Sequence, residues 1–129
     1  MELDILSHDY LRLIERLRKH YAVHAGNTLS IQLIKMQEEL GEVAEAFIGA
    51  NGLNPRKGVT HTQDDLNMEL ADVVITAVLA LRMSTGSSVA VNEILRRQAL
   101  KTIGRLEEFD QRSPTGTKFI DDGATTPAH

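Results

Sequence analysis

The sequence contains no cysteine and no tryptophan, and aromatic residues make up only 4% of its 129 positions. Without cysteine the chain has no disulfide, no thiol nucleophile and no zinc–thiolate site. The scarcity of aromatic residues argues against a β-sandwich, whose strands are rich in aromatic and β-branched side chains. An excess of basic residues is also missing, since 18 acids against 14 bases give a formal net charge of −4. That balance argues against a nucleic-acid polymer as the partner.

Long hydrophobic runs are absent as well. The longest, from Val73 to Leu81, contains Thr76, and it is far shorter than the ~20 residues of a membrane span. The first residues, Met1 to Asp4, are acidic and lack the basic start of a signal peptide. We therefore expect one domain, no membrane partner and, by default, a cytoplasmic protein.

Apolar residues recur at alternating steps of four and three in four segments, which is the period of one helix face. The predicted helices cover residues 7–24, 28–50, 62–84 and 89–109. Turn and capping residues separate them, namely Gly26, the run 51–58, and the run 86–88. The polar remainder, residues 110–129, predicts a flexible tail. The expected fold is thus an all-α, four-helix domain over residues 1–109.

The second and third predicted helices are apolar on more than one face. Outside their main apolar rows they carry Ile31, Ile34 and Ile48, and Val74, Ile75, Val78 and Leu79. A helix that is apolar all round is buried on several sides, whereas a single four-helix bundle of this size leaves each helix one wet face. The pattern therefore predicts self-association as a homodimer or homotetramer.

Two short stretches, 39–43 and 69–73, share the order acid, Leu, small residue, acid, Val. The acids in each are three residues apart, so they are neighbours on the helix surface. Both pairs lie two to three turns, roughly 12–15 Å, from the loop that joins the helices. An antiparallel hairpin would therefore bring four carboxylates side by side, those of Glu39, Glu42, Glu69 and Asp72.

Four carboxylates crowded beside an apolar core repel one another, so their crowding indicates a cation among them. Oxygen-only ligands favour Mg²⁺, with Mn²⁺ as a substitute, and Mg²⁺ commonly binds the phosphates of a substrate. The alternative is a solvated acidic helix face, which the stretch 38–45 would indicate if it stood alone.

The run Glu38-Glu39-Leu40-Gly41-Glu42, followed after a loop by Glu69-Leu70-Ala71-Asp72, resembles the all-α nucleoside triphosphate pyrophosphohydrolases, the MazG-like superfamily. The resemblance covers residues 7–109 and implies a MazG-like bundle with a central antiparallel hairpin. It also implies Mg²⁺-dependent cleavage of a nucleoside triphosphate to monophosphate and pyrophosphate, as in nucleotide-pool house-cleaning. By position, Glu39, Glu42, Glu69 and Asp72 would hold the metal, and Glu38 would orient or deprotonate the attacking water.

The sequence departs from the family pattern near the end of the fourth predicted helix. Many relatives carry a Lys, an Asn four residues later, and then a basic residue before an aromatic one. Here Lys101 is followed by Arg105 in place of the Asn, and Glu108 precedes Phe109. Some relatives stack the base on Trp, which this chain lacks, so the base is not predicted.

The candidate phosphate contacts come from two places in the chain. One pair lies in the fourth predicted helix and the other in the loop beside the carboxylates, where it would close over phosphates as a lid. These residues are Lys101, Arg105, Arg56 and Lys57. For each the alternative is a basic side chain that faces solvent or another subunit.

Two rival functions stay open. A phosphoribosyl-ATP pyrophosphohydrolase would have the same site and a different substrate, and a non-catalytic helical module would bind a cation or nucleotide without releasing pyrophosphate. Other classes lose support, because the helices carry no Glu-x-x-His pair of a di-iron bundle and the chain has no Gly-rich phosphate loop.

Overall fold

The structure is a computed structural model that describes residues 5–24 and 28–113, with only the backbone of His24. These residues form four α-helices and no strand, so the all-α class is confirmed. The helices are α1 (His8–His24), α2 (Leu29–Ala50), α3 (Gln63–Thr85) and α4 (Ser88–Arg112). Their bounds agree with the predicted ones to within one residue, except at the end of α4.

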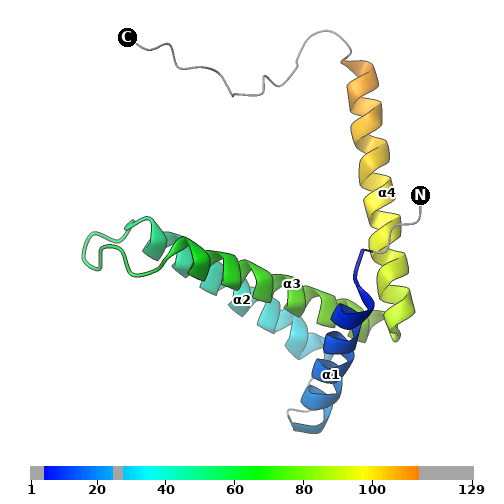
Figure 1. Ribbon diagram of the computed structural model, residues 1–129, viewed down its shortest axis with the longest axis horizontal. Coiled ribbons are helices and arrows are strands. Elements are labelled where there is room, and N and C mark those ends of the chain that lie inside the picture. Colours follow the sequence, from blue (N-terminus) through cyan, green and yellow to red (C-terminus); the bar gives the residue numbers. More distant parts are fainter. Residues whose placement is uncertain (1–4, 25–27, 114–129) are drawn as a thin grey trace.

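Helices α2 and α3 lie side by side as an antiparallel hairpin, which forms the long arm in Figure 1. A polar contact inside the hairpin joins them, because the buried Gln32 donates from Nε2 to the backbone oxygen of Thr76 at 3.2 Å. At the closed end, the Thr60 amide donates to the Gly49 carbonyl at 3.0 Å and holds the connecting loop against α2. The predicted antiparallel pairing of the second and third helices is therefore confirmed.

Local capping fixes both ends of α3. At the start, the Asp65 amide donates to the Thr62 hydroxyl at 3.1 Å and the Thr62 amide donates to the Asp65 carboxylate at 2.7 Å, which is a capping box. At the end, Gly86 has a φ of 84°, a left-handed conformation that favours glycine. Ser87 then caps α4 by accepting the Ala90 amide at 3.1 Å. The predicted break at residues 86–88 is confirmed.

The main core lies at the corner where α1 crosses the open end of the hairpin and α4 begins (Figure 1). Ile14 from α1, Val78 and Leu79 from α3, and Val91 from α4 form one buried cluster. Glu15 ties the same corner together through polar contacts. Its carboxylate accepts hydrogen bonds from the Arg82 guanidinium of α3 and, at 3.0 Å, from the Ser88 hydroxyl of α4.

Helix α4 differs from expectation in its direction and its length. The chain turns by 112° between α3 and α4, so the distal half of α4 rises away from the hairpin (Figure 1), and one chain does not close a four-helix bundle.

The helix also continues through Arg112, which corrects the predicted helix end at residue 109. No breaker precedes Pro114, whose ring disfavours helix at the residue before it. Residues 114–129 of the predicted tail, and the predicted stop at Gly26, lie outside the described residues.

No single helix in the described part of the chain is long and apolar enough to cross a membrane. Helices α3 and α4 meet the criteria of length and composition only as a bent pair, with the 112° turn between them.

Candidate metal centre

The hairpin brings carboxylates from α2 and α3 together. One carboxylate oxygen from each of Glu39, Glu69 and Asp72 lies within 4.8 Å of the other two. Glu69 and Asp72 are three residues apart on α3, so they share one helix surface, and the antiparallel pairing places Glu39 of α2 at the same level. Glu39 and Glu69 are partly buried and Asp72 is exposed, so the group lies at the surface with its oxygens accessible to a ligand.

Glu42, the fourth predicted ligand, belongs to the same cluster. Its carboxylate lies within hydrogen-bonding reach of Glu69, and its negative charge acts on both Glu39 and Glu69. The structure therefore gathers all four carboxylates that the repeated pattern singles out. Three of them converge on one point, and Glu42 flanks them.

The electrostatics of the cluster show the cost of this crowding. Loss of solvation raises the pKa of Glu39, and the charges of Glu42 and Asp72 raise it further. The pKa of Glu69 is also raised, first by loss of solvation, then by the charges of Glu42 and Asp72 and by the hydrogen bond with Glu42. Both carboxyls therefore hold protons more tightly than a free glutamate, and a bound cation would relieve the repulsion.

The donor set fits a hard divalent cation. Mg²⁺ takes oxygen ligands at about 2.1 Å in an octahedron, where opposite ligands are ~4.2 Å apart. Neighbouring ligands of such an octahedron are ~3.0 Å apart. The oxygens of Glu39, Glu69 and Asp72 lie within 4.8 Å of each other, so side-chain movements of up to about 1 Å would bring them onto a common ion. Carboxylates without thiolate or imidazole favour Mg²⁺ or Mn²⁺ over zinc.

Glu38, the predicted base, points to a different partner. Its carboxylate accepts a hydrogen bond from the Lys35 ammonium at 3.1 Å, and this contact raises the pKa of Lys35. Lys35 thus pairs with the acidic run 38–45 at the residue that precedes Glu39. Glu38 is not among the three converging carboxylates, although its charge reaches Glu39. Its role as the base stays a prediction.

The two basic loop residues lie in the turn that follows α2. The Arg56 amide donates to the Asn54 side chain at 3.2 Å, and the Lys57 amide donates to the Asn54 carbonyl at 3.1 Å, so a turn presents both side chains to solvent. Lys57 also lines a small cleft of about 330 Å³ with Glu45 of α2 and His61. His61 lies close enough to act electrostatically on Glu69, so this loop borders the carboxylate cluster.

Lys101 and Arg105 are not brought to the cluster within one chain. Asp72 lies near the middle of α3, and Lys101 lies near the middle of α4. Each is therefore roughly 20 Å from the corner where the two helices meet, at about 1.5 Å per residue. With a turn of 112° between the helices, they lie roughly 20 Å apart. A phosphate bound at the carboxylates is out of reach of these side chains in the same chain.

Sequence reasoning missed a basic cleft between α1 and α4 that includes Arg12, Arg16, Lys19 and Arg96. The spacing of Arg12, Arg16 and Lys19 at steps of four and three places them on one face of α1, and this pattern was readable in the sequence. The contribution of α4 was not readable, because it depends on the direction of that helix after Gly86.

No family model, no curated protein and no solved structure matches this chain. The features of this chain that indicate a function are the geometry of the carboxylates and the pattern of the two acidic stretches.

Proposed function

We propose that this protein is a Mg²⁺-dependent nucleoside triphosphate pyrophosphohydrolase. The observation that carries the proposal is the convergence of Glu39, Glu69 and Asp72 within 4.8 Å, on two helices that share one acidic pattern. In the proposed reaction a water oxygen attacks the α-phosphorus and the bond between the α-phosphorus and the α–β bridging oxygen breaks. Pyrophosphate leaves with that oxygen and its electron pair, and the water proton passes to a carboxylate or to solvent.

Each carboxylate has a role in this proposal. Glu39, Glu69 and Asp72 hold the cation, and Glu42 completes the set beside Glu69. When bound, Mg²⁺ supplies positive charge against the phosphate oxygens. Glu38 takes the water proton after release from Lys35, and Lys57 closes over the phosphates from the neighbouring loop. A cytoplasmic role in nucleotide-pool house-cleaning is part of the same proposal.

The test is a chromatographic assay of products from a panel of nucleoside triphosphates with Mg²⁺. Wild-type protein should release pyrophosphate and the monophosphate. Asp72→Asn removes one ligand charge while it keeps the side-chain shape, so turnover should fall by more than the ~10–100-fold that loss of an outer-shell partner costs. Asp64→Asn is the matched control, because Asp64 is an exposed acid in the first turn of the same helix.

The products also separate the two rival functions. Release of pyrophosphate from phosphoribosyl-ATP but from no nucleoside triphosphate would assign the site to that enzyme class. Binding of Mg²⁺ and a nucleotide without any product would assign a non-catalytic module. Release of orthophosphate and a diphosphate would show cleavage between the β- and γ-phosphates, which would contradict the proposal.

A further inference from the structure

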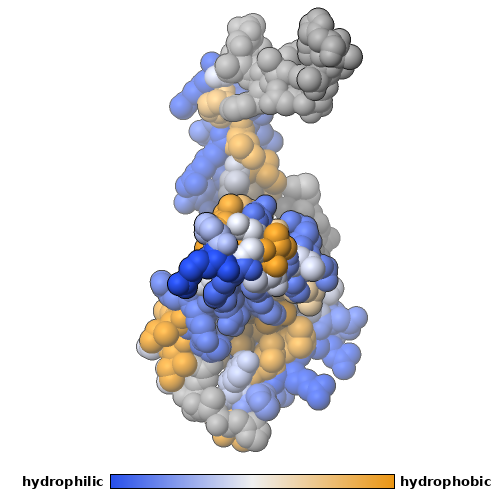
Figure 2. All heavy atoms as spheres, turned by 90° about the vertical axis from the view of Figure 1, so that its left-hand side faces the viewer, coloured by the Kyte–Doolittle hydropathy of each residue, from blue (hydrophilic) through white to orange (hydrophobic). Residues whose placement is uncertain are grey.

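An apolar row follows α4 out of the core. Leu95, Ala99, Ile103 and Leu106 recur at steps of four, four and three, so they share one helix face. Leu95 packs against the core cluster, whereas the distal half of the helix rises free of the other helices (Figure 1) and orange side chains follow it in Figure 2. Leu106 is 59% exposed, and Phe109, one turn further, is 51% exposed. Helices gain most of their stability from packing such a face, so we expect another protein surface to cover the exposed part of this row.

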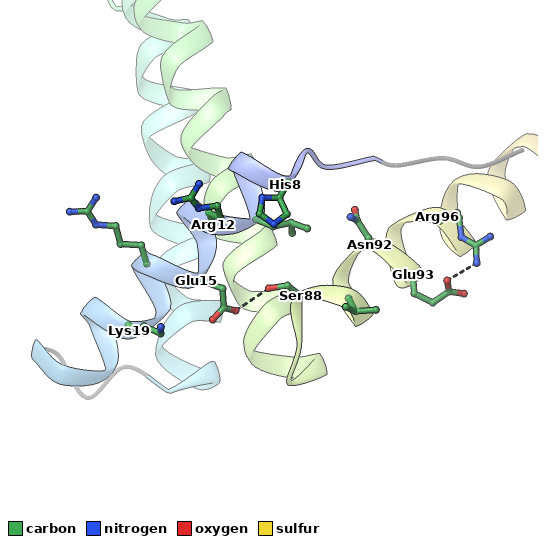
Figure 3. A pocket seen from close by; sticks show the side chains of 11 residues that line it. His8, Arg12, Glu15, Lys19, Ser88, Asn92, Glu93 and Arg96 are labelled. Carbon is green, nitrogen blue, oxygen red and sulfur yellow. Dashed lines mark hydrogen bonds and ion pairs between the residues drawn. The ribbon is translucent and has the colours of Figure 1, made fainter.

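A wide cleft lies at the other end of the same helix. It has a volume of about 1060 Å³ and lies between α1 and the first half of α4 (Figure 3). Its apolar lining includes Leu11 and Val89, and Val89 is 82% exposed. The four basic side chains are Arg12, Arg16, Lys19 and Arg96, against two acids, Glu15 and Glu93.

The acids that line this cleft already have partners, and the basic side chains that remain give the cleft a positive charge. Glu15 is already engaged by Arg82 and Ser88, and Glu93 accepts a hydrogen bond from Arg96 at 2.6 Å. Arg16 and Lys19 make no ion pair within the described part of the chain. The cleft therefore fits an occupant that combines apolar side chains with carboxylates.

The distal end of α4 has this chemistry. Leu106 and Phe109 are its exposed apolar side chains, and three acids accompany them, Glu107, Glu108 and Asp110. Within one chain this end cannot fold back into the cleft, because both lie on the same continuous helix. Ser88 and Leu106 are roughly 27 Å apart along its axis, at about 1.5 Å per residue. The end of α4 therefore matches the cleft of a second copy.

The order of residues along α4 also fits an antiparallel pair. The apolar row is nearly symmetric about position 101, so Leu95 meets Leu106 of the partner subunit, and Ala99 meets Ile103 of the partner subunit. The same register brings Arg96, which lies beside the row, next to Glu107 of the partner subunit. A two-fold axis repeats this pairing, so each dimer contains it twice.

We propose that two copies of this chain associate by antiparallel packing of their α4 helices, so that residues 106–110 of each copy fill the α1–α4 cleft of the other. The interface is isologous, with an apolar centre and charge pairs at its rim. This inference does not depend on the proposed hydrolysis.

A charge-reversal experiment with light scattering tests the register. Wild-type protein should have twice the chain mass of 14.3 kDa, or a multiple of that dimer. Arg96→Glu alone and Glu107→Arg alone should each raise the dissociation constant by about tenfold or more, because both rim contacts become like-charged. A mixture of the two single variants should associate again, because each copy then meets the opposite charge in the other.

Arg97→Glu is the matched control, because Arg97 is the next residue on α4 and faces away from the apolar row; it should leave the mass unchanged. Circular dichroism would confirm that all variants keep their helix content. The proposal is overturned by a wild-type monomer, by single variants that associate like wild type, or by a mixture that stays dissociated.

A disulfide experiment gives a second readout, because the wild-type chain has no cysteine. Thr102 lies close to the two-fold axis on the side of the apolar row, so Thr102→Cys should form a covalent dimer on mild oxidation. Gly104→Cys lies two residues away on the opposite face, with open space around the new side chain, and should stay monomeric under denaturing electrophoresis. Equal cross-linking of both variants, or none with Thr102→Cys, would contradict the antiparallel packing.

Discussion

Gly49 is the position at which the loop beside the metal centre is fixed to α2, and its replacement by alanine tests that packing. A Cβ atom at Gly49 would lie 2.1 Å from His61 Nδ1 and 2.5 Å from Thr60 Oγ1, so both side chains and the loop behind them must move. The Thr60 amide also donates to the Gly49 carbonyl, which resists that movement. Gly49→Ala therefore overpacks a buried helix–loop contact.

Two effects of opposite sign decide how far Gly49→Ala changes the free energy of unfolding. Overpacking a close contact costs typically ~1–3 kcal/mol, and alanine in place of glycine inside a helix returns up to ~1 kcal/mol. We expect a net loss of about 1–2 kcal/mol in the free energy of unfolding, or roughly 4–8 °C in Tm for a chain of this size. Urea denaturation followed by circular dichroism measures it.

Gly104→Ala is the matched control. It makes the same substitution inside α4, where nothing lies within 4 Å of the new Cβ, so only the gain in helix propensity remains. This variant should be more stable than wild type by about 0.5–1 kcal/mol. If Gly49→Ala were equally stabilised, the loop would not be packed on Gly49, and the placement of Lys57 beside α2 would be wrong.

Three further predictions concern the corner and the cluster. Glu15→Gln should lower the free energy of unfolding by ~1–3 kcal/mol at pH 7, because it weakens charge-assisted contacts. Since the Arg82 hydrogen bond lowers the pKa of Glu15 from 4.5, that stabilisation should disappear as the pH falls below about 4.5. Gly86→Ala should cost ~1–2 kcal/mol, because its φ of 84° is left-handed; no loss in thermal melts would refute this. In EDTA, the free energy of unfolding of the wild type should decline as the pH rises above 4.5, because the raised pKa of Glu39 means that the folded state binds this proton more tightly than the unfolded state. Glu39→Gln removes this titration, so the variant should show a smaller decline. Identical pH profiles would show that Glu39 is not crowded.

Helix bounds were predictable because their determinants are local. The capping box at Thr62 and Asp65, the left-handed Gly86 and the cap at Ser87 all lie within a few residues of the ends that they define. The carboxylate cluster was predictable for a related reason. A short loop makes neighbouring helices antiparallel, and two acidic pairs at equal distance from that loop must then meet.

The direction of α4 was not predictable, because a break at residues 86–88 fixes where the helix starts and not how far the chain turns. Consequently, Lys101 and Arg105 were expected near the phosphates, whereas in one chain they lie roughly 20 Å from the carboxylates. The α1–α4 cleft depends on the same turn. Glu15 was not singled out either, because its partners Arg82 and Ser88 are 67 and 73 residues away in the sequence.

The central claim is that Glu39, Glu42, Glu69 and Asp72 form a site for a divalent cation, and Mn²⁺ binding followed by electron paramagnetic resonance tests it most directly. Metal-free wild-type protein should remove the signal of free Mn²⁺ at one or two ions per chain, and Mg²⁺ should compete. Asp72→Asn should bind Mn²⁺ at least ~10-fold more weakly, while Asp64→Asn should bind like wild type. Equal binding by the wild type and Asp72→Asn, or no binding by either, would show that the carboxylates are only a crowded surface.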